Sequence, residues 1–467
     1  MLRKIFKPGI ICILLLLICW QTGASWVARP ALFPSVTDIL FRLQSMVLHV
    51  GFYLDISATL LRGLTGFLIA GTFALLMAVL SVHRPFWKSF FHPVVVILRS
   101  IPVISVVLIA LLWFSPPSLP VFIALLTMFP ILYQNILSGL ELTDIKLVEM
   151  AKLYHKNSIN RFLMIYLPGA RKIMLDGMAT AMGFGWRAII IGEALANPAH
   201  AIGTGMKKAQ SFIQMDHLLA WTVVAIFISF VFDFIIRQFN KTERKSGLKI
   251  RKDTEPEVQM KNINQTQFEI KNIAKSFNKS TLIHINKLTL SRKNIYLFDS
   301  PSGSGKTTCF KIISGILKND RSNLSVHATF SMAFQDYRLI PWLTVKENIA
   351  FPLQTYPKIS ITQQKNIDKL IQLLDSEHLQ EAFPATLSGG EVKRIEVIRA
   401  LTYPADILIL DEPFAGLDQA NKLKLIDAIE DYIEQYEAVV LIATHDLNFS
   451  FSYPVQSVSL ITDNISQ

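Results

Sequence analysis

Residues 298–308 read "FDSPSGSGKTT". An apolar, strand-like run precedes this segment and a helix-favouring run follows it, which is the context that a phosphate-binding loop needs. Backbone N–H groups around Gly303 and Gly305 can surround phosphate oxygens, Lys306 can reach the β and γ oxygens, and Thr307 can ligate Mg²⁺. The other loop residues that we assign to nucleotide binding are Ser302, Ser304 and Thr308. The second half of the chain is therefore predicted to be an α/β nucleotide-binding domain.

The first half of the chain has a different composition. The 467 residues leave room for two or three domains, and 51% of them are hydrophobic, concentrated before about residue 237. The net charge of +11 falls largely in short stretches between apolar runs and in the segment 241–253, "KTERKSGLKIRKD". Basic loops beside membrane spans stay on the cytoplasmic side. No basic face with interleaved aromatic residues occurs, which argues against nucleic-acid binding.

Apolar runs long enough to cross a bilayer recur through the first half. A single run of this kind is compatible with a large soluble core, but six in succession favour a multi-pass membrane domain. The six expected spans are 8–26, 60–81, 92–114, 118–138, 174–196 and 217–237. The basic N-terminus also matches a cleaved signal peptide, and we favour a retained first helix because further spans follow it.

Lysine and arginine residues orient these spans. With the N-terminus inside, most basic residues of the connecting segments fall on the cytoplasmic side. These residues are Arg3, Lys4, Lys7, Arg84, Lys88, Lys146, Lys152, Lys156, Arg161, Arg171, Lys172, Arg237, Lys241, Arg244 and Lys245. Arg29, Arg42, Lys207 and Lys208 fall outside, so the bias is incomplete. The three cysteines, Cys12, Cys19 and Cys309, show no spacing typical of disulfides or zinc, and the second half is predicted to be cytoplasmic.

The fifth expected span carries small and ionisable residues. Gly177, Ala181 and Gly185 are spaced by four residues and share a helical face, which permits close packing of another helix, a subunit interface or a pathway wall. Arg187 and Glu193 do not share a face, and we expect pairing with other helices rather than a substrate role.

The segment "VEMAKLYHKNSINRFLMIYLP" (148–168) resembles the cytoplasmic loop of prokaryotic ABC importer permeases. The residues that match this family's pattern are Glu149, Ala151, Ile165, Leu167 and Pro168, while Met150 and His155 depart from it. The surrounding segments "ILRSIPVISVVLIALLWF" and "MGFGWRAIIIGEAL" look most like permeases of the nitrate/sulfonate/taurine group. The resemblance implies a type I importer permease whose loop 149–168 docks as a coupling helix on an ATPase.

Further motifs in the second half strengthen the nucleotide assignment. The segments "ILILDEP" (407–413), "LSGGE" (387–391), "GLD" (416–418) and "ATHD" (443–446) occur with a glutamine at 335, and this set resembles the ABC transporter ATPase signature. The resemblance implies that Asp411 and Gln335 help Thr307 hold Mg²⁺, and that Glu412 is the base that activates water. It also implies that Gln335 senses the γ-phosphate and contacts the permease, and that His445 contacts the γ-phosphate as a switch. The resemblance implies that Ser388, Gly389 and Gly390 clamp the γ-phosphate of ATP held by an opposite cassette. It also assigns Phe277, Glu391 and Asp418 to nucleotide contact, with Phe277 stacking on adenine.

Two residues depart from the ATPase pattern. Ser300 replaces the first glycine of the phosphate loop, and at a position that requires positive φ a serine costs about 1 kcal/mol. Glu391 replaces the usual glutamine and adds a negative charge near the clamp. All residues that do the chemistry are present, so we expect an active site.

These observations predict a membrane permease at 1–240 with a coupling loop at 149–168, a basic linker at 241–265, and an ATP-binding cassette at 266–467. The expected function is ATP-driven import of a small solute across the cytoplasmic (inner) membrane, with ATP and Mg²⁺, by a homodimer in membrane lipid. Substrate delivery is expected to need a separate extracytoplasmic binding protein. An exporter half-transporter and an ATP-driven signalling complex are the alternatives, and the substrate stays open among nitrate, sulfonates, taurine, bicarbonate and vitamin precursors.

Overall fold

The computed structural model of the chain divides into two compact units. One unit comprises residues 1–143 and 169–243, and the other comprises 144–168 and 244–467. The structure describes residues 2–27, 29–241, 249–251, 266–277, 280–301, 303–321, 326–353, 358–445 and 450–460. The loop 144–168 therefore groups with the C-terminal residues rather than with the helices that flank it in sequence.

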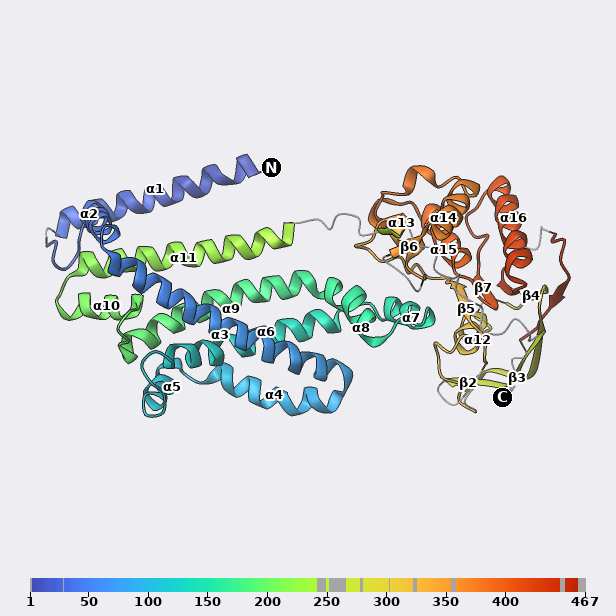
Figure 1. Ribbon diagram of the computed structural model, residues 1–467, viewed down its shortest axis with the longest axis horizontal. Helices are drawn as coiled ribbons and strands as arrows, with labels where there is room; N and C mark the ends of the chain where they lie inside the picture. Colours follow the sequence, from blue (N-terminus) through green and yellow to red (C-terminus); the bar gives the residue numbers. More distant parts are fainter. Residues whose placement is uncertain are drawn as a thin grey trace. The chain divides into compact units, whose positions relative to one another are not determined.

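The N-terminal unit is entirely helical in its described residues (Figure 1). Its helices are α1 (Leu2–Val27), α2 (Val36–Val47), α3 (Val50–His83), α4 (Pro85–Ser100), α5 (Val103–Ala110), α6 (Leu119–Glu141), α9 (Leu167–Ala196), α10 (Ile202–Ser211) and α11 (Met215–Lys241). Four of the described helices, α1, α3, α6 and α11, are long and apolar enough to cross a membrane. The unit is thus a multi-pass membrane domain.

Two of the six expected spans differ from the expectation. The span 92–114 is not one helix, because α4 and α5 meet at a bend of 92° and count together as a fifth candidate span. Pro102 lies at the bend as the residue preceding α5, and a proline disfavours helical geometry in the residue before it. The 30-residue α9 is long enough to span, but it is not among the described helices that are apolar enough to count as candidate spans.

Small residues of α9 pack on α6 within the same chain. A Cβ atom added at Gly177 would lie 2.3 Å from the Cβ of Asn135, and one added at Gly185 would lie 2.1 Å from the Cε of Met128. The Cβ of Asn135 leaves no room for a side chain at Gly177, and Met128 would have to shift to admit one at Gly185, so the small face of α9 serves packing in the chain itself. Glu193 on α9 is fully buried and pairs with Arg62 of α3 at 2.7 Å, as expected for an ionisable group among membrane helices.

The C-terminal unit contains a five-stranded parallel sheet with the strand order β5-β7-β8-β4-β9. Its strands are β4 (Ile295–Phe298), β5 (Phe330–Ala333), β7 (Ile407–Asp411), β8 (Val439–Ala443) and β9 (Val455–Ser457). Continuous apolar strands such as β7 and β8 are fully buried, as in parallel sheets covered on both faces. The unit also contains two sheets of two strands each. One pairs β1 (Lys249–Arg251) with β6 (Lys358–Ser360), and the other pairs β2 (Gln267–Phe277) with the antiparallel β3 (Ser280–Ser291).

Helices cover this sheet (Figure 1). They are α12 (Lys306–Ile313), α13 (Val345–Ala350), α14 (Ile361–Leu373), α15 (Gly389–Thr402) and α16 (Gln419–Tyr436), with short turns η2 (Glu377–Leu379) and η3 (Pro384–Thr386). The loop 144–168 adds α7 (Ile145–Leu153), α8 (Ser158–Arg161) and the π-helical turn η1 (Phe162–Tyr166). Because the strands are parallel, the residues that follow β4, β5, β7 and β8 all lie at one edge of the sheet, where ligands bind in open α/β folds.

Candidate functional site

The loop between β4 and α12 has the backbone of a phosphate cradle. Gly303 and Gly305 have φ angles of 83° and 92°, which favour glycine, and Gly305 immediately precedes α12. The buried hydroxyl of Ser304 has no hydrogen-bond partner among the described residues. An orphaned buried donor beside a helix N-terminus fits an anionic ligand such as a nucleotide phosphate. Ser302 lies outside the described residues, and Thr308 lies in the first turn of α12.

The serine at position 300 is not strained. Among the described residues, non-glycine residues with positive φ occur elsewhere, and Ser300 is not one of them. Its side chain is buried, and its hydroxyl accepts a hydrogen bond from the backbone N–H of Leu460 at 3.2 Å. Its carbonyl accepts from the ammonium of Lys306. Ser300 therefore anchors the loop to the C-terminal segment without the backbone cost that a positive φ would impose.

Three side-chain oxygens converge beside the loop. The hydroxyl of Thr307 lies 2.6 Å from Oδ2 of Asp411 and 3.1 Å from Oε1 of Gln335. Burial raises the pKa of Asp411, and the Thr307 hydroxyl opposes that rise. Hydroxyl, amide and carboxylate oxygens are the ligands that Mg²⁺ prefers. The donor set thus fits a magnesium ion held mainly through one carboxylate, which leaves positions for phosphate oxygens and water.

Glu412 and His445 lie next to each other at the same edge. Oε1 of Glu412 is 3.5 Å from Nε2 of His445, and that nitrogen lies 3.2 Å from Nζ of Lys306. Glu412 has a φ of 51°, and its N–H donates to the carbonyl of Ala443 at 2.8 Å. A left-handed glutamate is a strained residue that the neighbouring strand holds in place. The predicted base, switch histidine and phosphate lysine are therefore brought together from three separate segments.

The signature residues begin helix α15. Ser388 is its N-cap and forms a capping box with Glu391, whose Oε2 accepts from both the N–H and the hydroxyl of Ser388 at 2.7 Å. These hydrogen bonds hold the pKa of Glu391 below its ordinary value. Ser388 and Gly389 are exposed, so they are open to a ligand from outside the chain. Glu391 consequently serves the helix start, where a carboxylate is favourable.

Two further assigned residues have separate positions. Asp418 caps α16 by accepting from the N–H of Asn421 at 2.8 Å. Phe277 ends β2, and its side chain lies outside the described part of the structure.

The loop 144–168 packs into the apolar core of the C-terminal unit. Its buried side chains include Met150, Ala151, Tyr154 and Ile165, which belong to the same cluster as the sheet residues. The ring of Tyr154 meets Tyr403 edge-on at 5.3 Å between centroids. Met150 and Ala151 are fully buried, so the loop is a constituent of this core.

Polar contacts surround this apolar seam. Arg338, which is fully buried, donates to Oε2 of Glu149 at 3.0 Å and to Oδ1 of Asp336 at 3.0 Å. Lys146 pairs with the other oxygen of Asp336 at 3.0 Å. Lys156 donates to the carbonyl of Leu353 at 2.6 Å, and burial lowers the pKa of Lys156 to about 8. The loop is thus held by an ion-pair network close to Gln335, which precedes Asp336 in the chain.

Comparison with known proteins bears on both units. Residues 31–245 match the family described as binding-protein-dependent transport system inner membrane component, and residues 283–415 match the family described as ABC transporter. The aliphatic sulfonates import ATP-binding protein SsuB of Bacillus subtilis (strain 168) is 33% identical over 181 residues, which cover 37% of this chain and 69% of that protein. The chain belongs to the ABC transporter family.

The other similarities are narrower. The sulfate/thiosulfate import ATP-binding protein CysA of Yersinia pseudotuberculosis is 32% identical over 215 residues, and the transporter spans only 59% of its length. A solved ATP-binding subunit of an ABC transporter aligns over 42% of the chain with 21% identity and a TM-score of 0.38.

Sequence reasoning missed two buried cations of the transporter's site. Lys393 on α15 donates to the carbonyls of Phe334 and Asp411 at 2.8 and 2.9 Å, so it ties the signature helix to both strand ends. Burial lowers the pKa of Lys393. Arg338 was the second omission, and its signal was a single charge within the otherwise apolar run "YRLIPWL".

Proposed function

We propose that the chain imports a small solute across the cytoplasmic membrane at the expense of ATP hydrolysis, with its C-terminal unit in the cytoplasm. The two family matches support this proposal because a membrane component and an ATP-binding component occur in one polypeptide. A second copy of the chain, a separate extracytoplasmic binding protein and surrounding lipid are the proposed partners. Sulfate and sulfonates, named for the related ATP-binding proteins, are the first substrates to examine.

One observation supports the coupling of the two activities best. The loop that follows membrane helix α6 contributes Glu149 to the side chain of Arg338, and Arg338 also holds Asp336. The neighbour of Asp336 in sequence is Gln335, whose amide oxygen lies 3.1 Å from Thr307 in the phosphate loop. A change in ligand at Thr307 can therefore move the strand end that carries the Arg338 contact. The proposed coupling path runs from the phosphate site through 335–338 to the loop 144–168.

In the proposed reaction, water attacks the γ-phosphate of ATP, the bond to the β-phosphate oxygen breaks, and the proton of the water passes to Glu412. Lys306 neutralises charge on the phosphates. His445, at 3.5 Å from Glu412, orients its carboxylate. Thr307, Gln335 and Asp411 are the residues that would hold Mg²⁺, which when bound supplies charge neutralisation on the phosphate oxygens.

The signature residues Ser388, Gly389 and Gly390, of which Ser388 and Gly389 are exposed, are proposed to complete the site of a second copy. One chain supplies one phosphate loop and one signature segment, so two chains arranged head to tail would form two complete sites. Asp418 and Glu391 then lie at the same contact, and Phe277 is the proposed support for adenine.

Purified full-length chain in lipid nanodiscs tests the proposal. Glu412→Gln removes the base but keeps the side-chain shape, so ATP turnover is expected to fall by roughly a hundredfold or more while ATP binding persists. Asp427→Asn, on α16 away from the strand ends, is the matched control. ATP turnover in Glu412→Gln equal to that of the control would reject Glu412 as the base.

A further inference from the structure

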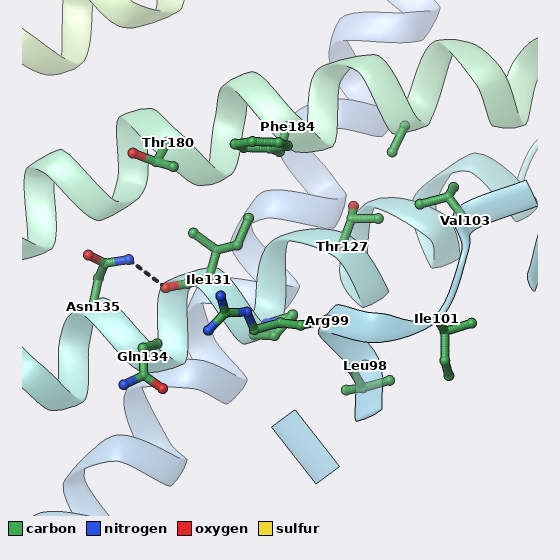
Figure 2. Close-up of a pocket in the computed structure, with 12 residues that line it drawn as sticks. Leu98, Arg99, Ile101, Val103, Thr127, Ile131, Gln134, Asn135, Thr180 and Phe184 are labelled. Atoms are coloured by element: carbon green, nitrogen blue, oxygen red, sulfur yellow. Dashed lines mark hydrogen bonds between the residues drawn. The ribbon is translucent and has the colours of Figure 1, made fainter. Parts of the chain in front are cut away.

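A cavity of about 520 Å³ lies within the N-terminal unit, between the α4–α5 bend, α6 and α9. Figure 2 shows its lining, with Arg99 and Ile101 at the bend, Thr127 and Gln134 on α6, and Thr180 and Phe184 on α9. All these residues belong to one compact unit. Thr127, Gln134 and Thr180 lie inside α6 and α9, within the stretches 118–138 and 174–196 that the sequence predicts to cross the membrane.

Arg99 is the charged residue of this cavity. It lies in the last turn of α4, within the bent α4–α5 pair that counts as a candidate span, and its side chain is exposed in the single chain. Within the part of the chain that the structure describes, Arg99 has no hydrogen bond or ion pair. An arginine in a membrane span is costly when it faces lipid, and such residues face the bundle interior or a water-filled path.

The other polar groups of the cavity narrow the choice of ligand. Thr127 and Thr180 donate their hydroxyl hydrogens to the carbonyls of Ile123 and Asp176 on their own helices, each at 2.8 Å. Asn135 donates to the carbonyl of Ile131 at 2.8 Å, as the dashed line in Figure 2 shows. The donors left for a ligand are therefore the guanidinium of Arg99 and the amide of Gln134. No carboxylate is among the lining residues.

We propose that this cavity is a binding site on the solute path, and that Arg99, assisted by Gln134, selects a small anion with a planar or tetrahedral oxyanion group. A guanidinium presents a fork of N–H donors that matches two oxygens of such a group, whereas a cation would meet an unscreened positive charge. The apolar lining, with Ile101, Ile131 and Phe184, suits the non-charged part of an organic anion. The inference rests on the proposed transport function and names the residues of the chain that would select the solute.

Cysteine labelling of the full-length chain in nanodiscs tests the site. Cys12 and Cys19 are replaced by Ser, Cys309 is buried and stays, and Thr180→Cys places a thiol in the cavity wall. The anionic reagent 2-sulfonatoethyl methanethiosulfonate should react faster than its trimethylammonium analogue. Arg99→Gln should lower this rate ratio by about tenfold or more, as expected for losing a unit charge at close range. Arg99→Lys should keep most of the preference.

Methanesulfonate is the ligand probe, with neutral dimethyl sulfone as its matched control. Methanesulfonate should slow labelling of Thr180→Cys saturably, dimethyl sulfone should not, and Arg99→Gln or Gln134→Glu should abolish the protection. Arg187→Gln, an arginine on the same helix as Thr180 but outside the lining, should retain it. The proposal would be overturned if both probes protected Thr180→Cys alike, or if methanesulfonate gave no protection up to molar concentration. It would also be overturned if Arg99→Gln abolished the dimer, because Arg99 would then hold two copies of the chain together.

ATP hydrolysis separates this inference from the proposed function. Each variant is assayed for ATP turnover in the same nanodiscs, and Arg187→Gln should hydrolyse ATP at the wild-type basal rate because Arg187 lies outside both the cavity lining and the C-terminal unit. If the protein hydrolyses ATP but methanesulfonate does not protect Thr180→Cys from labelling, only the proposed anion site is rejected. Loss of hydrolysis in wild-type protein rejects the transport proposal itself.

Discussion

Replacement of Glu149 probes the contact between the loop 144–168 and the rest of the C-terminal unit. Glu149→Ala removes one of two carboxylates from Arg338, which is fully buried, whereas Glu149 itself is 28% exposed. Loss of one partner from a fully buried pair costs about 3–5 kcal/mol, and an exposed pair contributes about 0–1 kcal/mol. Because Asp336 remains at 3.0 Å from Nε of Arg338, we expect an intermediate cost of about 1–2 kcal/mol.

Glu149→Lys is the more severe change. It places a second cation next to Arg338 and close to Lys146, and two unit charges at about 4 Å repel by about 4 kcal/mol at an effective dielectric constant near 20. The loop should then open far more often, since about 1.4 kcal/mol corresponds to a factor of ten in an equilibrium.

Hydrogen exchange of the amides in α7, measured by mass spectrometry on full-length protein in nanodiscs, reports this opening. Glu149→Ala should accelerate exchange in α7 by roughly tenfold, and Glu149→Lys by considerably more. Lys152→Ala is the control, because Lys152 is exposed on the same helix. Exchange in Glu149→Lys within twofold of wild type, in a folded protein, would refute the role of the ion pair.

The same variants address coupling. If the loop transmits movement, cellular uptake should fall in Glu149→Lys while ATP hydrolysis by detergent-solubilised protein persists. Equal loss of uptake and hydrolysis in a normally folded protein would contradict a coupling role.

Three further predictions concern assembly, pH and the signature segment. Chains with Lys306→Ala or Ser388→Arg should each be nearly inactive alone. A mixed dimer of the two should regain ATP hydrolysis, because one composite site is then intact. Failure of differently tagged copies to co-purify from active membranes would exclude the homodimer. The pKa of Lys156 is about 8 in the folded chain and about 10.5 in the unfolded chain, so the unfolded state binds more protons between these two pH values. The free energy of unfolding should therefore rise with pH, by about 1 kcal/mol from pH 7 to 9. Lys156→Met should flatten this rise in thermal unfolding experiments, and an unchanged slope would rule out Lys156 as its source. Glu391→Gln keeps a side-chain acceptor for the capping box but removes a negative charge near the proposed clamp, so the KM for ATP should fall with little change in thermal stability. An increased KM would show that the negative charge of Glu391 does not weaken ATP binding.

The sequence by itself determined the two kinds of unit and most of the nucleotide site. Six long apolar runs in succession are rarely found in soluble domains, so the sequence indicated a membrane unit. A strand, a glycine-rich loop and a helix in this order form a local pattern, so the phosphate loop around Lys306 could be recognised directly. The acidic residues at the end of β7 could be recognised in the same way, because the apolar run ends in two consecutive carboxylates, Asp411 and Glu412.

Only the tertiary structure decided how distant segments meet. The break of the span 92–114 at Pro102 depends on packing as well as on proline, and it produced a cavity at Arg99 that no local pattern indicates. The backbone at Ser300 proved compatible with a side chain, which the sequence left conditional. The partners of Lys393 and Arg338 could not be assigned from the sequence, because these side chains satisfy carbonyl and carboxylate groups from far along the chain. Buried ions depend on partners brought by the fold, and those partners have no fixed spacing in sequence.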